Sequence, residues 1–237
     1  MLSKKYFITS NDVDQFYELK ISSFFKMMQE VASQNAEELG IGHTYTKSKN
    51  LFWVISRFFV KIHKLPKYQD NVILTTYPGQ TIKFIFPRYF VLEDECGNKL
   101  IEASSTWLVL YNDSRKVCIN PFDKELPNED KEGQISLPDK VDVLEELEFI
   151  ENRKVRYNDI DLNGHLNNTK YIDYIIDVHD SDFYKQYSIK ELLINYNHEV
   201  KDNDIISLYS NKSNPEIIKG NIQEINSFDV KITYSKK

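Results

Sequence analysis

The chain has 237 residues, a formal net charge of -6 and 41% hydrophobic residues. The length suits two units of roughly 100 residues, with enough apolar side chains for a sizeable core. The acidic balance argues against a general nucleic-acid binder, because phosphate contacts need a surplus of Lys and Arg. No run approaches the ~18 apolar residues of a membrane span. The first residues also lack the apolar stretch of a signal peptide, so we expect a cytoplasmic protein with no membrane partner.

The two cysteines, Cys96 and Cys118, indicate neither a disulfide framework nor a structural zinc site. We expect no bound cofactor or metal. Two short basic segments, within residues 61–67 and 153–156, are candidates for contact with an acidic partner, although solvated strand ends are the more common explanation of such segments.

The first predicted element is a helix over residues 24–39, where apolar side chains recur at three- and four-residue spacing. Ser22 and Ser23 predict a serine cap at its start, and Gly40 predicts a glycine stop at its end.

From residue 52 to residue 120 the pattern changes to β, with many β-branched and aromatic residues. Short turns at 94–98 and 112–115 favour hairpins, and hairpins make a sheet antiparallel. The helix and the sheet together predict an α+β domain. The predicted strands are 53–62, 72–77, 84–92, 99–111 and 116–119.

The order of elements then repeats after a proline-containing stretch without periodicity. We therefore predict a first domain at 1–125, a linker at 126–147 and a second domain at 148–237. Residues 70–77 also resemble residues 202–209, an offset of 132 positions (202 minus 70), which supports an internal duplication. In the second half a helix is predicted at 168–178, and strands at 149–157, 190–199, 204–210, 217–225 and 229–234.

The most unusual stretch, residues 157–168, reads Tyr-Asn-Asp-Ile-Asp-Leu-Asn-Gly-His-Leu-Asn-Asn between a predicted strand and a predicted helix. Asp161, Asn163 and His165 alternate along it, so in an extended segment their side chains would point to one side and meet a common substrate. The start of the following helix offers unpaired backbone N–H groups and a partial positive charge. That environment suits a developing oxyanion.

Three other interpretations of this stretch compete with a catalytic site, namely a calcium loop, a zinc ligand and a plain turn. Residues 159–164 reproduce the first half of an EF-hand loop, but its twelfth position holds Lys170 instead of the bidentate Glu, which disfavours calcium. His165 lacks the His or Cys partners of a zinc site. A plain turn rich in Asn and Gly remains the main alternative to a site on the residues alone.

The pattern Tyr-x-Asp-x-Asp-x-Asn-x-His-Leu-Asn-Asn-x-Lys-Tyr, from Tyr157 to Tyr171, resembles the signature of the acyl-ACP thioesterases, the family of the plant FatA and FatB enzymes and their bacterial relatives. The resemblance covers nearly the whole chain, including the first helix and the strand that begins at Trp53. Shorter versions of the motif occur in other hotdog thioesterases that act on acyl-CoA.

The resemblance implies a tandem (double) hotdog fold, each half a curled antiparallel sheet around a long central helix. Asp161, Asn163 and His165 match the family's catalytic positions, and its catalytic Glu, in a segment resembling Tyr-x-x-Glu, falls on Glu199. The next residue is a cysteine in plant members and Val200 here, so a cysteine nucleophile cannot operate at that position.

Hydrolysis of a thioester by water needs a base and oxyanion donors. We expect Glu199 or Asp161 to activate water, His165 to orient the groups or exchange a proton, and Asn163 with helix N–H groups to stabilise the oxyanion. A covalent anhydride on a carboxylate stays open as an alternative.

The first half has no comparable polar cluster, and in the family this half accommodates the acyl chain. Candidate contacts with the chain are Trp53, Phe58, Phe84 and Trp107, although for any one of them a place in ordinary core is more common.

The implied function is hydrolysis of acyl-ACP to free fatty acid and holo-ACP in fatty acid biosynthesis, with acyl carrier protein and its phosphopantetheine-linked chain as partner. The alternatives are an acyl-CoA thioesterase and a non-catalytic hotdog module that binds acyl groups; two carboxylates beside a His disfavour the second. Because tandem hotdogs pair internally, we expect a monomer or a homodimer.

Overall fold

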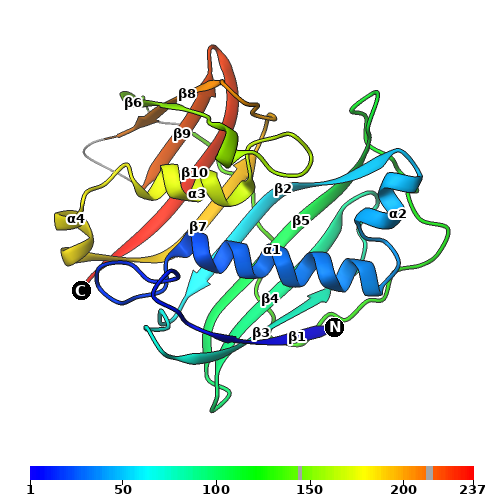
Figure 1. The fold of residues 1–237 in the computed structure, drawn as a ribbon, viewed down its shortest axis with the longest axis horizontal. Helices are drawn as coiled ribbons and strands as arrows, with labels where there is room; N and C mark the ends of the chain where they lie inside the picture. The colour runs from blue at the N-terminus through cyan, green and yellow to red at the C-terminus, as the bar shows by residue number, and fades with distance from the viewer. Residues whose placement is uncertain (144–145, 212–215) are drawn as a thin grey trace. The chain divides into compact units, whose positions relative to one another are not determined.

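The computed structural model describes residues 1–143, 146–211 and 216–237. The chain forms two compact units, Met1–Pro138 (unit 1) and Asp139–Lys237 (unit 2). Each unit combines helices with an antiparallel sheet (Figure 1). The expected α+β class is confirmed.

Unit 1 places one long helix against a sheet whose neighbouring strands are all antiparallel, in the order β1-β3-β4-β5-β2. Its elements are β1 (Leu2–Phe7), α1 (Ile21–Glu38), α2 (His43–Ser48), β2 (Leu51–Ile62), β3 (Asn71–Pro78), β4 (Phe86–Asp94) and β5 (Lys99–Tyr111).

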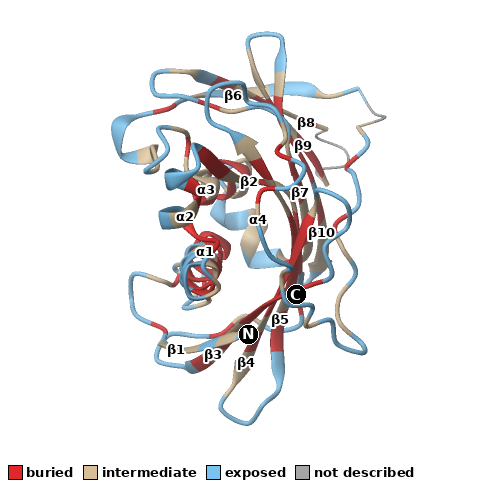
Figure 2. Ribbon diagram, turned by 90° about the vertical axis from the view of Figure 1, so that its right-hand side faces the viewer, coloured by how far each residue is buried: buried red, intermediate tan, exposed pale blue. Residues whose placement is uncertain are grey.

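Helix α1 is held by the burial of its apolar face, and it lies across the strands of unit 1 in Figure 1. Phe24, Met28 and Val31 are at most 1% exposed, and full burial of such a side chain contributes roughly 1.5–3 kcal/mol. The ring of Phe25 lies 4.8 Å from that of Phe58 on β2. Buried positions concentrate on α1 and the strands, whereas the connecting loops are mostly exposed (Figure 2).

The start of α1 differs from the prediction. The helix begins at Ile21, so Ser22 and Ser23 lie buried inside its first turn, and no side chain caps it. The predicted serine cap is wrong because the packed face extends to the first residue of the helix. At the other end Gly40 adopts a left-handed φ of 66° and donates its N–H to the carbonyl of Glu37, as a glycine stop does.

Two other elements of unit 1 were not predicted, namely β1 and α2. Strand β1 is a short strand at the end of the sheet order whose residues are exposed or half-buried in alternation, so Lys4 and Lys5 obscure its pattern. The predicted strand 116–119 is reduced to an isolated bridge between Leu110 and Val117.

Unit 2 repeats the design, with strand order β7-β10-β9-β8-β6 and antiparallel pairing. Helix α3 buries Ile172 and Ile175 completely. Helix α4, capped by Asp180, was not predicted. The elements are β6 (Glu148–Lys154), the short 3-10 helix η1 (Tyr157–Asp159), α3 (Asn168–Ile176), α4 (Ser181–Gln186), β7 (Tyr187–Tyr196), β8 (Ile205–Ser210), β9 (Ile217–Ile222) and β10 (Ile225–Lys236).

The strands of the two units correspond one to one, with β1, β3, β4, β5 and β2 matching β6, β8, β9, β10 and β7. In the turn before β3 the backbone N–H of Lys67 donates to Asp70 Oδ2 (2.7 Å). In the turn before β8 the N–H of Lys201 donates to Asp204 Oδ2 in the same way (2.7 Å). Equivalent residues here are thus 134 positions apart (204 minus 70), and the offset of 132 is wrong by two. Since strand side chains alternate with a period of two, the shifted alignment still matched inward with inward positions.

The segment after β5 has no helix or strand within residues 121–143. Its first part packs on unit 1: the N–H of Glu129 donates to the carbonyl of Pro78, and the hydroxyl of Ser104 donates to the carbonyl of Ser136. The predicted linker 126–147 includes residues 144–145, which lie outside the described residues, and its bounds stay a prediction. Within the described chain, every helix is too short or too polar to cross a membrane.

Candidate active site

The stretch between β6 and α3 is a tight loop closed by Asp161. Its N–H donates to the carbonyl of His165 (2.8 Å), and its carbonyl accepts the N–H of Gly164 (3.1 Å). One carboxylate oxygen, Oδ1, accepts the N–H groups of Asn163 (2.8 Å) and His165 (3.2 Å). Gly164 has a left-handed φ of 81°, which a glycine adopts without strain. Asp161 therefore builds the loop that carries the other candidates.

This geometry corrects the expected extended segment. Asp161, Asn163 and His165 lie in a turn, because the Asp161 carboxylate takes backbone N–H groups that a strand would pair elsewhere. Asn163 is exposed, whereas the side chain of His165 is only 14% exposed.

Glu199 lies three residues beyond the end of β7 and next to this loop. The adjoining carbonyl of Val200 accepts the N–H of Leu166 (2.8 Å), which fixes the two segments side by side. As a result Glu199 Oε2 is 3.1 Å from His165 Nε2. The Glu199 side chain is 31% exposed, so the pair is partly shielded and still reachable by water.

The position after Glu199 carries no thiol. Val200 is completely buried, and both cysteines, Cys96 and Cys118, are free thiols of unit 1. No cysteine nucleophile stands at this position of the loop.

The start of α3 follows the loop directly. Asn167 caps the helix, its side-chain oxygen accepting the N–H of Thr169 (3.0 Å), while its own N–H donates to Asp159 (2.8 Å) and its carbonyl accepts the N–H of Lys170 (2.8 Å). Within this described stretch the N–H of Asn168, the first helical residue, is left without an intramolecular acceptor. A helix N-terminal N–H of this kind carries a partial positive charge, so it is a candidate oxyanion donor.

Tyr171, the last residue of the signature, is a buried residue of α3, which the sequence interpretation counted only as part of the apolar pattern. It is 4% exposed and its ring packs against Phe228. Burial raises the pKa of Tyr171 well above its ordinary value, a hydrogen bond with Ser227 opposes this, and the charges of Asp161, Glu199 and Asp204 raise it further. Tyr171 is therefore a buried, neutral phenol of the core of unit 2.

The carboxylate of Asp159 is used within the fold. Its Oδ2 accepts the hydroxyl of Tyr174 (3.0 Å) and the N–H of Arg156 (2.9 Å), and its Oδ1 lies 3.5 Å from Lys170 Nζ. Among the described residues, no group of three or more His, Cys, Asp or Glu side chains is arranged to hold a metal ion.

Residues 8–20 of unit 1 reproduce most of the hydrogen bonds of the loop at 155–167, at an offset of 147 positions (161 minus 14). The N–H of Asp14 donates to the carbonyl of Glu18 (2.9 Å). Its Oδ1 accepts the N–H groups of Phe16 (2.8 Å) and Glu18 (3.1 Å), as in unit 2. The loop backbone is therefore present in both units, and the signature residues occur in only one of them.

The two loop sequences share few residues. Residues 11–19 and 158–166 have in common Asn-Asp at the start, an Asp two positions later and a final Leu. The left-handed position of Gly164 is occupied in unit 1 by Tyr17, with a φ of 62°. The shared residues are the ones that close the loop, and the sequence comparison missed the copy because so few of them are needed.

The unit 1 copy lacks the partner carboxylate. By the 134-position offset Leu65 stands where unit 2 has Glu199. In unit 1 the N–H of Tyr68, in the neighbouring turn, donates to the carbonyl of Tyr17 in the loop (3.0 Å). This hydrogen bond has no counterpart in the described part of unit 2. The loop that carries His165 thus has a side-chain pair to the neighbouring segment, where the unit 1 loop has this backbone hydrogen bond.

Two of the four predicted chain-contact residues come together. The rings of Trp53 and Trp107 lie 6.2 Å apart, edge to face. Phe122 and Phe86 complete an aromatic cluster around Trp53, with ring centroids 5.4 and 5.2 Å from that of Trp53.

The other two lie elsewhere in unit 1. Phe58 is 2% exposed and stacks on Phe90 in the core beneath α1. Phe84 is 36% exposed, in the turn between Ile82 and Ile85.

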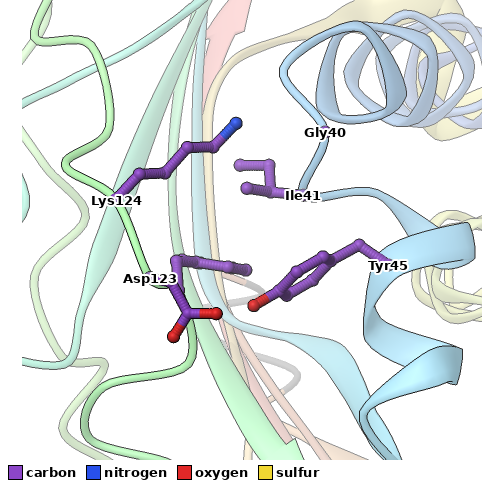
Figure 3. Close-up of a pocket in the computed structure, with 6 residues that line it drawn as sticks. Gly40, Ile41, Tyr45, Asp123 and Lys124 are labelled. Carbon is purple, nitrogen blue, oxygen red and sulfur yellow. The ribbon is translucent and has the colours of Figure 1, made fainter.

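A pocket of about 220 Å³ adjoins the aromatic cluster in unit 1. In Figure 3, Lys124 and Asp123 on the segment after β5 face Ile41 and Tyr45. Phe122 belongs to both the pocket and the cluster, and the indole N–H of Trp53 donates to the carbonyl of Ile41 (2.8 Å). The pocket is smaller than typical ligand sites of ~300–1,000 Å³.

A helix with an antiparallel sheet, present twice in the same strand order, is the architecture of double-hotdog proteins; in unit 2 it brings His165 from the loop after β6 next to Glu199 from the segment after β7. The chain matches the family models "Acyl-ACP thioesterase N-terminal domain" over residues 1–123 and "Acyl-ACP thioesterase C-terminal domain" over residues 144–236. It belongs to the acyl-ACP thioesterase family.

Similar proteins fit this assignment. Oleoyl-acyl carrier protein thioesterase 2, chloroplastic, of Arabidopsis thaliana is 23% identical over 231 residues, covering 90% of this chain and 63% of the relative. The chain thus spans less than two thirds of that relative's length. The solved acyl-ACP thioesterase of Bacteroides thetaiotaomicron has a TM-score of 0.84 at 21% identity, covering 98% of this chain and 97% of that one. The 12:0-ACP thioesterase of Umbellularia californica has a TM-score of 0.84 at 19% identity, covering 100% and 97%. At these identities the structures support the fold.

Proposed function

We propose that the chain hydrolyses acyl thioesters carried by acyl carrier protein, with Glu199 as the base. The observation that carries the proposal is the 3.1 Å approach of Glu199 Oε2 to His165 Nε2 beside a helix N-terminus. The two backbone bonds to Asp161 Oδ1 support giving that carboxylate the task of holding the loop. Of the two candidate bases, Glu199 is therefore preferred.

In this mechanism Glu199 takes a proton from water while the water oxygen attacks the thioester carbonyl carbon. The carbonyl oxygen becomes an oxyanion, stabilised by the amide of Asn163 and the N–H of Asn168. Collapse of the tetrahedral intermediate breaks the C–S bond, and the leaving thiolate receives the proton from Glu199 through His165. The products are the free fatty acid and the thiol of the carrier.

We assign the acyl chain to unit 1. The aromatic cluster around Trp53 and Trp107, with the adjoining pocket at Ile41 and Phe122, supplies apolar surface, and each CH2 buried there contributes about 0.8 kcal/mol. Phe58 and Phe84 are kept as weaker candidates, since the first is core and the second is exposed.

The proposed carrier is acyl carrier protein and the proposed role is in fatty acid biosynthesis, in line with the family and with the names of the relatives. We place the reaction in the cytoplasm. The free thiols of Cys96 and Cys118 are consistent with a reducing compartment.

Substitution of Glu199 by Gln tests the proposal, because it keeps the shape and removes the base. Single-turnover release of thiol from acyl-ACP is expected to fall roughly 10²- to 10⁴-fold. Glu224→Gln, a change at an exposed Glu of the same unit, serves as the matched control and should leave the rate unchanged. A Glu199→Gln variant with near-normal turnover would reject Glu199 as the base. Folded wild-type protein that releases no thiol would reject the function, and preferred turnover of acyl-CoA would reassign the carrier.

A further inference from the structure

Two large apolar side chains stand in solvent at the candidate site. Tyr157 is 86% exposed and Leu162 is 78% exposed. Leu162 belongs to the same turn as His165, three residues before it, and Tyr157 begins η1 at the entrance to the loop. A single exposed apolar residue needs no explanation. Two on the loop that carries the site do.

The unit 1 copy of the loop provides the comparison. At an offset of 147 positions, Ser10 and Gln15 occupy the positions of Tyr157 and Leu162, and both are exposed as well. The same backbone thus places these positions in water in both units. The unit 1 loop also exposes large apolar side chains, but at other positions: Phe7 is 55% exposed and Tyr17 is 65% exposed, where unit 2 has Lys154 and Gly164. Apolar surface thus lies at different places on the two loops, and only in unit 2 does it lie on the turn that carries His165.

Positive charge accompanies the apolar residues. Lys154 and Arg156 are exposed, and the bonds of Val155 to Asn203 and Asp204 bring them beside the turn that begins with Lys201. Among the described residues no salt bridge engages any of these three cations.

In unit 1 the positions of Lys154 and Arg156 hold Phe7 and Thr9, and only the lysine of the turn is kept, as Lys67. The opposing charges in the unit 2 turn are Asp202, which is exposed and accepts the side-chain amide of Asn203, and Asp204, which accepts the backbone N–H of Lys201.

Arg153, the remaining cation of the basic segment, is not part of this surface. Its guanidinium lies 2.8 Å from Glu151 and 3.5 Å from Asp177, and it stands over the ring of Tyr174. The basic segment noted in the sequence is thus divided between one internal pair and two outward cations. The two outward cations are opposite in sign to the net charge of the whole chain, which is -6.

We propose that Lys154, Arg156, Tyr157, Leu162 and Lys201 form a docking rim for the acidic protein that delivers the thioester. The inference rests on the proposed function and names the surface used by its carrier. An acidic surface would pair with the three cations while Tyr157 and Leu162 make the apolar contact beside the entry of the thioester arm. Complementary charge of this kind acts mainly on encounter and partner choice.

Binding of holo-acyl carrier protein, measured by titration calorimetry at low salt, tests the rim without depending on turnover. The double variant Arg156→Glu with Lys201→Glu should raise the dissociation constant roughly tenfold or more. The affinity of the wild type should fall with added salt. The matched control is Thr9→Glu with Lys67→Glu, which makes the equivalent changes on the unit 1 loop and should bind like wild type. Equal affinity of the two double variants, or no binding by the wild type, would overturn the rim.

Turnover separates this outcome from failure of the proposed function. The test compares two substrates of the rim variant: acyl-ACP and an acyl-N-acetylcysteamine thioester, which has no carrier protein. The loss in kcat/KM relative to wild type should be roughly tenfold or more greater for acyl-ACP than for the carrier-free thioester. Equal losses on both substrates would show that these residues act in catalysis or in folding and would reject the proposal of a docking rim. Absence of any thioester turnover by the wild type, with carrier still bound at the rim, would reject the hydrolase and keep the surface.

Discussion

The loops at 8–20 and 155–167 have the same length, most backbone hydrogen bonds in common and the same Asp-centred turn, yet only the second carries a His beside a carboxylate. In the first loop Glu18 stands at the His position, and Leu65 stands at the Glu199 position. The difference shows that the turn is a structural unit which exists without chemistry. What turns it into a site is a small set of side chains placed on a backbone that does not need them.

This comparison also separates two roles that the sequence joined. Asp161 sits in the signature with the other polar residues, but Asp14 makes the same bonds in a loop that has no His–carboxylate pair. In the proposed mechanism the aspartate therefore holds the loop, and His165 with Glu199 carries the chemistry. Variants made in pairs, one in each loop, can test that division.

The largest effect is expected from exchanging the residue at the His position. His165→Glu puts the unit 1 residue into the site, removes the imidazole and sets two carboxylates side by side, so kcat/KM for acyl-ACP should fall roughly 10²- to 10⁴-fold. The converse change, Glu18→His, should stay within about twofold of the wild type, because that loop has no part in the proposed reaction. A comparable loss from both exchanges would show that the unit 1 loop takes part in catalysis.

An intermediate effect is expected from removing the loop-closing carboxylates. Asp14→Ala and Asp161→Ala each delete two hydrogen bonds to a charged acceptor, so each should lower the free energy of unfolding by about 1–3 kcal/mol in urea titrations. Only Asp161→Ala should also cost activity, by roughly tenfold or more, through the displaced His165. If Asp161→Ala lost activity without losing stability, Asp161 would act in the chemistry itself and the shared role would be wrong.

The smallest effect concerns the left-handed position. Gly164→Ala places a Cβ where no atom lies within 4 Å, so its cost is that of the backbone conformation alone, about 1 kcal/mol, seen as a lower Tm. Tyr17→Gly should relieve the equivalent backbone strain in unit 1 and so raise the Tm slightly. The gain is reduced by loss of the ring contact between Tyr17 and Tyr68. A drop in Tm for Tyr17→Gly would show that the ring contact outweighs the backbone strain.

Sequence patterns predicted the elements whose periodicity is strong. Helix α1, helix α3 and the long strands of unit 1 follow from apolar spacing, because each of them buries one full face. The short edge strand β1 and the helices α2 and α4 bury too little to leave a pattern. The serine pair at 22–23 misled the assignment of the cap, since a serine enclosed by packing and a serine at a cap look alike in sequence.

The sequence supplied the candidate residues of the site but not its shape. The signature pointed to His165 and Asp161, and the Tyr-x-x-Glu segment pointed to Glu199. The alternation of polar residues suggested an extended segment, because sequence spacing does not reveal that one carboxylate will bind the backbone N–H groups two and four residues later. The N–H of Asn168 becomes a candidate donor only through the capping of α3, which spacing does not encode.

The outermost strands, β1 in unit 1 and β6 in unit 2, close the order of strands in their sheets with sequences that have little in common, Leu-Ser-Lys-Lys-Tyr-Phe and Glu-Phe-Ile-Glu-Asn-Arg-Lys. Both are short and both carry charged side chains along a row of open backbone groups. Charge on such an edge discourages strand addition by another chain and hence aggregation. Charge at a sheet edge, rather than any step of the proposed reaction, is what these two strands have in common, and many different sequences can supply it.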